Sequence, residues 1–209
     1  MTVRNLLIAG LAAGAVLSFA TLTSAQTPAA QPPPLTYGPP IAGLCTFSFN
    51  QVVAQSKVGQ SFANRLKVLA QQVGAELQPQ ADAINTEKRT LESQASTLDR
   101  ATLDARQANL ELRYQNFEKL NQQRQAEMQA TEQKQLAVLQ AQVEPIVRQL
   151  FQARQCSTLL ARDSGAVLVS TPGNDISGGA VTALDAKIQT LTFDREHIDP
   201  NAPQQPAGR

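Results

Sequence analysis

The sequence predicts an α+β, mainly helical protein in which a long antiparallel coiled-coil hairpin arm stands on a small β-rich body. Apolar residues are dense near both ends of the foldable region, and between these ends Leu, Ile or Phe recur about every seven residues. The chain has 209 residues, no Trp and only 4% aromatic residues. One chain therefore has little material for a large compact core.

The first 25 residues have the layout of a secretory signal peptide. Arg4 supplies the positive charge, an apolar run of about 15 residues follows, and small residues precede Gln26. Cleavage between Ala25 and Gln26 is therefore predicted. An uncleaved membrane anchor is the alternative, but the run is shorter than the roughly 20 residues that span a bilayer. The mature protein is expected outside the cytoplasm.

The mature chain is electrically balanced. The full sequence has 18 Lys and Arg against 17 Asp and Glu, and removal of Arg4 leaves 17 of each. A net charge near zero gives no reason to expect nucleic acid as a partner. Residues 66–144 contain nine basic and eleven acidic residues, so the predicted arm is near neutral as well.

Composition divides the mature chain into segments. Residues 26–40 are rich in Pro and predict an extended linker. Residues 194–209 have a similar composition and predict a disordered tail. Between them we expect an oligomerisation body, built from residues 41–65 and 145–193, and a helical-hairpin arm over residues 66–144.

The body is expected to begin with a short buried strand in "IAGLCTFSF", followed by one or two helical turns. Ser56 can then cap the first arm helix. After the arm, "STLLAR" and "AVLVST" predict two strands of a hairpin, joined at residues 163–165. Asp175 or Ser177 is expected to cap a last short helix over roughly residues 180–191.

Two prolines and one reversal divide the arm. Pro79 removes a backbone donor, and a kink is favoured over a full stop because the apolar heptad spacing resumes beyond it. Thr97 or Asp99 is expected to cap the second arm helix after the reversal. Pro145 predicts a further bend. Each arm helix has about 40 residues, which corresponds to roughly 60 Å.

The order of these elements resembles the Skp (OmpH-like) family of periplasmic chaperones. The strand that enters "NQVVAQSKVGQSF", with Ser56 and Gly59, is similar to the start of that family's fold. "LDARQANLELRYQNFEKL" and "VEPIVRQLF" look like its second arm helix, and "CSTLLARDSGAVLVSTPGNDIS" looks like its terminal hairpin and Asp-Ile-Ser turn at residues 175–177. The resemblance covers about Ile41 to Leu191.

The resemblance implies a periplasmic holdase that binds unfolded outer-membrane proteins in a cavity between three helical arms, without enzymatic activity or a cofactor. It also implies a homotrimer whose strands build the central body, which makes this body a trimerisation domain. A peripheral contact with the membrane or with lipopolysaccharide stays open. A structural or adaptor coiled-coil protein of the envelope is the alternative, although an adaptor needs flanking β-rich domains and a structural coiled coil needs no body.

No residue pattern indicates an enzyme or a metal site. His197 is the only histidine and falls in the predicted tail, so no catalytic set can be assembled around it. Gly178 and Gly179 lack the spacing and the lysine of a phosphate-binding loop, and they are expected at a helix start.

A few residues are candidates for the body and for client contact. Cys45 and Cys156 lie in or beside predicted strands of the same body, so a disulfide is expected in an oxidising compartment, with two buried free thiols as the alternative. Tyr114, next to the expected seam between the arm helices, and Met128 are candidates for facing a client, and a seam position is the alternative for Met128. The expected core of the trimer body comprises Leu44, Phe47, Phe49, Leu150, Phe151, Leu159 and Leu168.

The segment "LNQQRQAEMQATEQKQL", residues 120–136, has only Met128 as a sizeable apolar side chain between its ends. Such a helix is expected to pack through one narrow seam and to expose the rest of its surface to water. If the arm walls a cavity, a Gln-rich inner face would keep three arms from sticking together and could hydrogen-bond an exposed backbone in any register. Client binding should then depend less on salt than in a strongly basic relative.

Overall fold

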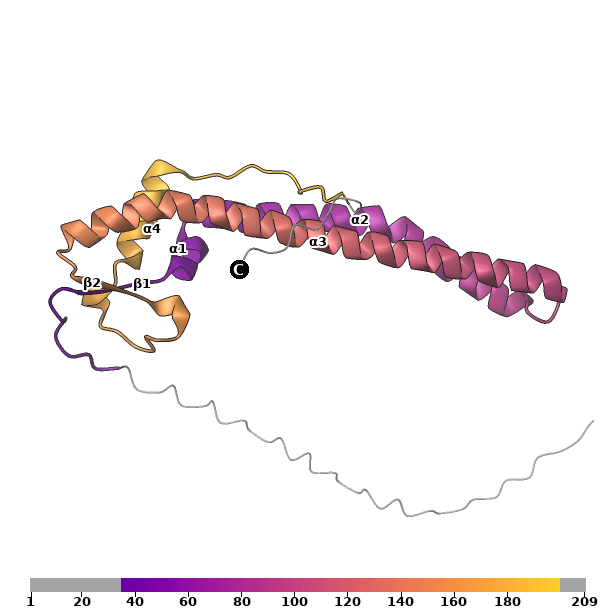
Figure 1. Ribbon diagram of the computed structural model, residues 1–209, viewed down its shortest axis with the longest axis horizontal. Coiled ribbons are helices and arrows are strands. Elements are labelled where there is room, and N and C mark those ends of the chain that lie inside the picture. The colour runs from indigo at the N-terminus through magenta and orange to yellow at the C-terminus, as the bar shows by residue number, and fades with distance from the viewer. Residues whose placement is uncertain (1–34, 200–209) are drawn as a thin grey trace, which may run out of the picture. The chain divides into compact units, whose positions relative to one another are not determined.

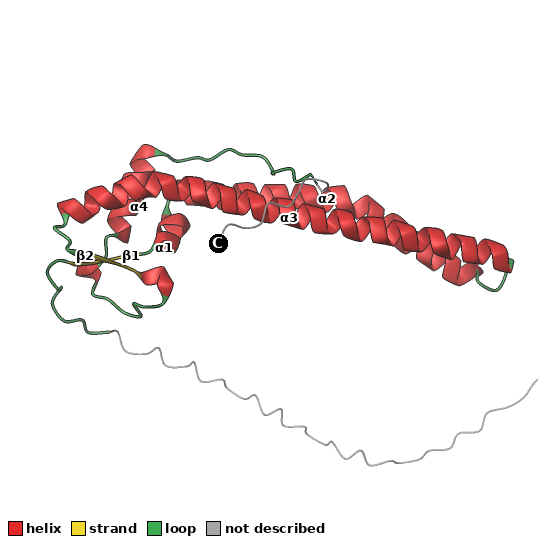
Figure 2. Ribbon diagram, viewed as in Figure 1, coloured by secondary structure: helices red, strands yellow, loops and turns green. Residues whose placement is uncertain are grey.

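The computed structural model describes residues 35–199, and the fold below is that of the unit beginning at Tyr37. The predicted cleavage site, Ala25 and Gln26, lies outside the described residues. The mainly helical α+β class is confirmed, with a small strand pair (Figure 2). The elements are β1 (Leu44–Phe47), α1 (Phe49–Gln55), α2 (Lys57–Gln94), α3 (Arg100–Ala153), β2 (Thr158–Ala161), the 3-10 helices η1 (Arg162–Ser164) and η2 (Pro172–Asn174), and α4 (Ser177–Lys187).

The two long helices, α2 and α3, lie side by side (Figure 1). Arg124 of α3 forms an ion pair with Glu76 of α2 at 2.6 Å. Farther along, Arg106 of α3 donates a hydrogen bond to Gln94 of α2 at 3.1 Å. Residue numbers therefore fall along α3 as they rise along α2, and we call this helix pair the arm.

The arm helices continue through both of their prolines. Pro79 lies inside α2 and Pro145 lies inside α3, so neither proline ends its helix. The reversal between the helices ends at Asp99, whose side chain accepts a hydrogen bond from the amide of Thr102 at 2.9 Å. This bond pairs one of the amides that a helix start leaves without an intrahelical acceptor.

The joint between α1 and α2 consists of one residue, Ser56. The Ser56 hydroxyl accepts a hydrogen bond from the amide of Gly59 at 3.1 Å. A Cβ atom on residue 59 would lie 1.7 Å from the carbonyl oxygen of Val53, closer than real contacts allow. The tight joint therefore requires glycine at position 59.

The strands β1 and β2 pair in parallel, with Leu44 opposite Thr158 and Phe47 opposite Ala161. The two strands are joined by the whole arm, as parallel pairing requires a long connection. They form the two-stranded sheet of the described residues. A sheet of this size has little stability by itself.

The predicted hairpin of "STLLAR" and "AVLVST" is wrong. Residues 166–171 form no strand in the structure. After β2 the chain enters the turn η1, which is followed by Gly165 in the left-handed conformation at φ 76°. This turn leads the chain away from β2, and a bridge between Asp175 and Thr46 occupies the other edge of β1 instead.

The core of the body lies where α1, α2, α3 and α4 meet. The last helix, α4, begins three residues earlier than predicted and ends four residues earlier, since it spans Ser177–Lys187. The Asp175 carboxylate accepts a hydrogen bond from the Ser177 amide at 2.8 Å and so fixes the start of this helix. The buried cluster comprises Val52, Val58, Phe62, Leu139, Val143, Ile146, Ala180 and Leu184.

Residues 188–199 run back along α2 and α3 without forming a helix or strand (Figure 1), and we call them the strap. Arg65 of α2 donates hydrogen bonds at 2.7 Å to the Phe193 carbonyl and to the Asp194 carboxylate. The Phe193 ring packs on Phe62, with ring centroids 5.9 Å apart. The predicted tail boundary therefore differs from the structure, because Asp194, Arg195, Glu196 and Ile198 bind side chains of the arm.

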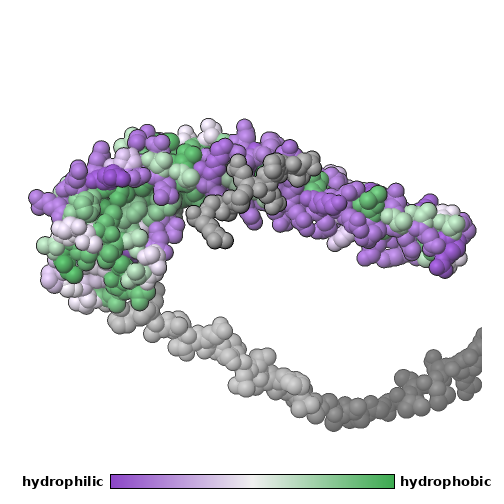
Figure 3. Space-filling view, viewed as in Figure 1, coloured by the Kyte–Doolittle hydropathy of each residue, from purple (hydrophilic) through white to green (hydrophobic). Residues whose placement is uncertain are grey.

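The surface of the arm is mainly polar, whereas apolar side chains gather over the body (Figure 3). None of the helices among residues 35–199 is long and apolar enough to cross a membrane.

Candidate functional site

The residues predicted for the trimer body surround the strand pair, but with unequal burial. Leu168 is 87% exposed and its neighbour Val169 is 59% exposed, so neither contributes to the core of this chain. Both line a groove of 750 Å³ with Ile41 and Leu160. The half-buried members of the predicted set are Leu44, Phe47, Phe49, Leu150, Phe151 and Leu159.

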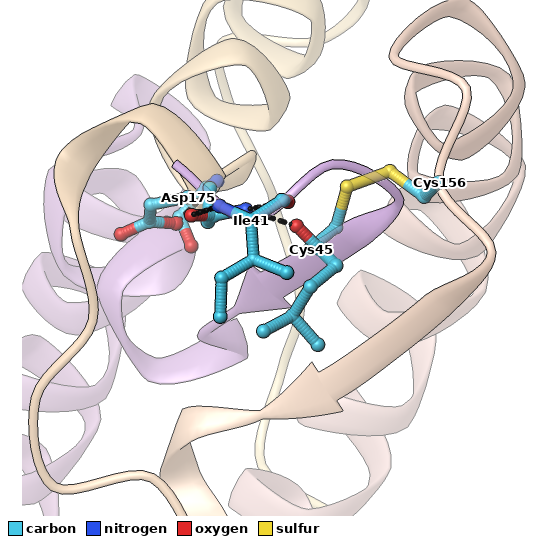
Figure 4. Close-up of a disulfide and its surroundings, with 7 residues drawn as sticks. Ile41, Cys45, Cys156 and Asp175 are labelled. Atoms are coloured by element: carbon cyan, nitrogen blue, oxygen red, sulfur yellow. Dashed lines mark hydrogen bonds between the residues drawn. A yellow bond between two sulfur atoms is a disulfide. The ribbon is translucent and has the colours of Figure 1, made fainter. Parts of the chain in front are cut away.

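Cys45 and Cys156 form a disulfide in the structure, with their Cα atoms 5.8 Å apart (Figure 4). Both cysteines are buried and pack with Ile176. Cys45 lies within β1, and Cys156 lies between α3 and β2. The bond thus ties the base of the arm to the first strand of the body.

A second connection within the body, between η1 and the start of α1, is electrostatic. Asp163 accepts hydrogen bonds from the hydroxyl of Ser48 at 2.6 Å and from the amide of Asn50 at 3.1 Å. Burial acts to raise the pKa of the Asp163 carboxyl, but these hydrogen bonds outweigh it and hold the pKa below its ordinary value. The ionised carboxylate therefore connects η1 to the start of α1. This arrangement is structural, since a carboxylate held by these donors is a poor proton acceptor.

The two predicted client-facing residues lie on α3 but do not form one patch. Tyr114 is 50% exposed, and Met128 is partly buried. They are 128 − 114 = 14 residues apart, which corresponds to roughly 21 Å along a helix. Any apolar contacts that they offer are therefore separate.

The segment predicted to expose its polar side chains to water buries several of them instead. Glu127 is 1% exposed, Thr131 is 0% exposed and Gln135 is 8% exposed. With Gln123, these residues recur every four positions and share one face of α3. We call this set the polar stripe. The spacing of four is visible in the sequence, but the residues that have it are polar, so the apolar periodicity that predicts a buried helix face does not reveal them.

The strap lies on the polar stripe and contacts it through main-chain groups. The amide of Glu196 donates to the Thr131 hydroxyl at 2.8 Å, and the amide of Ile198 donates to the Glu127 carboxylate at 3.4 Å. The Gln123 side chain donates to the Ile198 carbonyl at 3.2 Å. The Thr131 hydroxyl also donates to the Glu127 carbonyl at 2.6 Å, which fixes its orientation.

Charged side chains surround these contacts. Glu76 pairs with Arg124 at 2.6 Å and with Arg195 of the strap at 3.2 Å. Both arginines also lie 3.2 Å from the Glu127 carboxylate, although Arg195 Nε makes no well-aligned hydrogen bond there. The hydrogen bond from Arg124 is the largest cause that holds the pKa of Glu76 below its ordinary value of 4.5, and Arg195 acts in the same direction. Two carboxylates and two guanidinium groups thus balance in charge.

The remaining candidates show no catalytic arrangement. His197 is exposed and lies beside Arg195 at a pocket of 200 Å³. Gly178 and Gly179 lie in the first turn of α4. Within residues 35–199, no group of three or more His, Cys, Asp or Glu side chains has a metal-binding arrangement.

Comparison with known proteins places the fold in a family. The profile of the family described as outer membrane protein (OmpH-like) matches residues 43–184. The crystal structure of a candidate outer membrane chaperone (OmpH-like) from Caulobacter crescentus CB15 is similar, with a TM-score of 0.68 and 38% sequence identity. The match covers 79% of this chain and 97% of that chain. Curated proteins give no match. This chain therefore belongs to the OmpH-like outer membrane protein family.

Proposed function

We propose that this protein is a periplasmic holdase chaperone, which binds unfolded outer-membrane proteins between the helical arms of a homotrimer. The observation that carries the proposal is the arrangement of an antiparallel helical hairpin with a polar surface on a body with an apolar surface (Figure 3). Membership in the OmpH-like family supports the same role. The Caulobacter relative, a candidate outer membrane chaperone, is similar over most of this chain.

Two features of the single chain support assembly into a trimer: its small strand pair and an exposed apolar groove. The strand pair is too small to be stable independently, and the groove beside it is lined by exposed Leu168 and Val169. Contiguous exposed apolar surface of this kind marks an interface. We therefore expect the bodies of three chains to cover this groove, while the arms remain apart.

The oligomeric state can be tested with one pair of substitutions. We expect Leu168→Lys to dissociate the trimer at micromolar concentration, because a lysine charge would be placed in the apolar interface. The matched control is Leu112→Lys, at a position on the arm that is 56% exposed. Light scattering should give the mass of a trimer for the unmodified protein and the control, and a lower mass for Leu168→Lys. A monomeric unmodified protein would refute the trimer.

The holdase activity can be tested by aggregation. An unfolded outer-membrane barrel protein is diluted from denaturant with and without this protein, at about 50 mM and about 500 mM NaCl. We expect suppression at both salt concentrations, because the arm is near neutral and its binding groups are mainly uncharged. No suppression at either concentration would exclude the chaperone function, whereas suppression only at low salt would leave the function intact and exclude binding by an uncharged face.

A structural or adaptor coiled coil is the competing function. Limited proteolysis of a complex with an unfolded barrel protein separates the two, because a chaperone arm should be protected by its client. Protection should include Tyr114 and Met128, the two residues that we propose to face the client. An arm that is cleaved equally fast with and without client would favour the structural function.

A further inference from the structure

The strap shows how the arm holds an extended polypeptide. Five of its main-chain groups are bound by arm side chains: the amides of Leu191, Glu196 and Ile198, and the carbonyls of Phe193 and Ile198. Backbone groups are common to all polypeptides, so these contacts do not depend on the sequence of the bound segment.

The spacing of the polar stripe fits an extended chain. Thr131 and Glu127 are four residues apart on α3, which corresponds to roughly 6 Å along the helix axis. Amides two residues apart in an extended chain are separated by roughly 6.6 Å. The amides of Glu196 and Ile198 have this relation, and they bind these two side chains in order. Gln123 and Gln135 extend the same spacing by one turn in each direction.

We propose that the polar stripe of α3 is a binding site for the backbone of extended polypeptide segments, and that the strap occupies it in the free protein as a displaceable competitor. The proposal rests on the proposed function, since an unfolded barrel protein supplies such segments. The strap is covalently attached, so its effective concentration at the stripe is high. A client segment must displace the strap in order to bind, and return of the strap promotes release without nucleotide.

The strap is also held by the charge of Arg195, and this contact can be removed without changing a residue of the stripe. Arg195 pairs with Glu76 and Glu127, so Arg195→Glu places three carboxylates together. This change should free the strap and leave the stripe itself intact. The matched control is Arg100→Glu, which makes the same charge change at the far end of the arm, where the Arg100 side chain is 89% exposed.

The first experiment measures binding of a probe peptide by fluorescence anisotropy. The probe is a labelled synthetic peptide with the sequence of residues 188–199, added to the full-length unmodified protein, Arg195→Glu or Arg100→Glu. We expect at least about tenfold tighter binding to Arg195→Glu than to the other two, because hydrogen bonds to charged groups hold the native strap in place. Equal binding to all three proteins would overturn the proposal.

Two further variants separate backbone recognition from charge. A peptide that is N-methylated at the positions of Glu196 and Ile198 retains every side chain but lacks the two amide donors, and it should lose binding to Arg195→Glu. Adding Thr131→Val to Arg195→Glu removes one acceptor at nearly constant volume and should weaken the unmethylated peptide. If methylation and Thr131→Val both leave binding unchanged, recognition is not through the backbone and the stripe is not the site.

The second experiment asks whether a client displaces the strap. Hydrogen exchange of the Glu196 and Ile198 amides is measured in the full-length protein, free and saturated with an unfolded outer-membrane barrel protein. We expect faster exchange in the complex. Unchanged protection in a complex that demonstrably forms would overturn the competition and leave the holdase function standing. If no complex forms, the proposed function fails, and the peptide experiment still decides whether the stripe binds extended chains.

Discussion

Reduction of the Cys45–Cys156 disulfide should lower the free energy of unfolding by several kcal/mol. The bond closes a loop of 111 residues in the unfolded chain. For a loop of this length the chain-entropy relation gives about 16 cal/mol/K, or about 4.8 kcal/mol at about 25 °C. Small domains have a total stability of only about 5–15 kcal/mol, so this change is a large fraction.

The structure gives a reason to expect most of this effect. The bond joins β1 to the chain just before β2, and each of these strands has four residues. Without the bond, the pairing of β1 with β2 depends on closing the whole arm into one loop, because the strands are parallel. Reduction should therefore loosen the strand pair before it affects the paired helices.

The measurement is urea unfolding followed by circular dichroism, on oxidised and reduced protein at equal concentration. Concentration must be matched because assembly contributes to apparent stability. A double variant, Cys45→Ala with Cys156→Ala, controls for the effect of the thiols themselves. A difference below about 1 kcal/mol between oxidised and reduced protein would refute the loop-entropy reasoning. Two thiols titrated in the unreduced, denatured protein would show that the bond does not form.

Two glycine substitutions, a change of pH and Glu76→Gln have predicted outcomes as well. Gly59→Ala should destabilise the protein by about 2–3 kcal/mol or more, because the added Cβ would lie 1.7 Å from a backbone oxygen. Gly74→Ala should instead stabilise α2 by about 0.4–1 kcal/mol, because no atom lies within 4 Å of the added Cβ. Equal stability of the two variants in urea unfolding would contradict the packing argument. Arg124 holds the pKa of Glu76 in the folded protein below its ordinary value of 4.5. Ionised Glu76 therefore contributes its full stabilisation of the folded state above about pH 4.5, and this contribution is lost as the pH falls through the lowered pKa. Strap amides should therefore exchange faster at about pH 3 than at about pH 7 after correction for intrinsic rates, and Glu76→Gln should remove the part of this pH dependence that Glu76 causes.

The arm and its caps were predictable because their signals are local. Ser56 was predicted to be an N-cap and Asp99 was one of two candidates, and both are N-caps in the structure. Gly59 is required by a contact with Val53, only six residues earlier in the sequence. The heptad spacing on either side of Pro79 favoured a kink over a full stop, and α2 does continue through Pro79 because packing along a partner compensates for one missing hydrogen bond.

The pairing of the strands was not predictable from the same kind of signal. "STLLAR" and "AVLVST" have the composition of a hairpin, but composition does not say which edge of which strand is free. β2 pairs with β1, and Asp175 takes the second edge of β1. These pairings are set by residues more than 100 positions apart, which is outside the range of turn chemistry.

The candidate site was predictable in composition but not in geometry. The Gln-rich segment suggested a face that binds polypeptide backbone, but burial of Glu127 and Thr131 could not be inferred from it. Both side chains accept hydrogen bonds from the strap, and residues 194–199 of the strap were predicted to belong to a disordered tail because the sequence that follows is rich in Pro. A charged residue such as Arg195 near a chain end gives no indication that its partners lie about 70 and 120 residues earlier.

The polarity of the stripe also limits how tightly the arm can hold any one segment. A hydrogen bond between uncharged groups contributes only about 0.5–1.5 kcal/mol net, and a competing strap reduces the apparent affinity further. A long unfolded chain can nevertheless be retained if several segments bind at once to the arms of the proposed trimer, since each later contact is intramolecular. Such binding is strong for a long unfolded chain and weak for a folded barrel, whose backbone groups are already paired. If the proposed function holds, client release would follow from folding of the client and return of the strap, without an energy source.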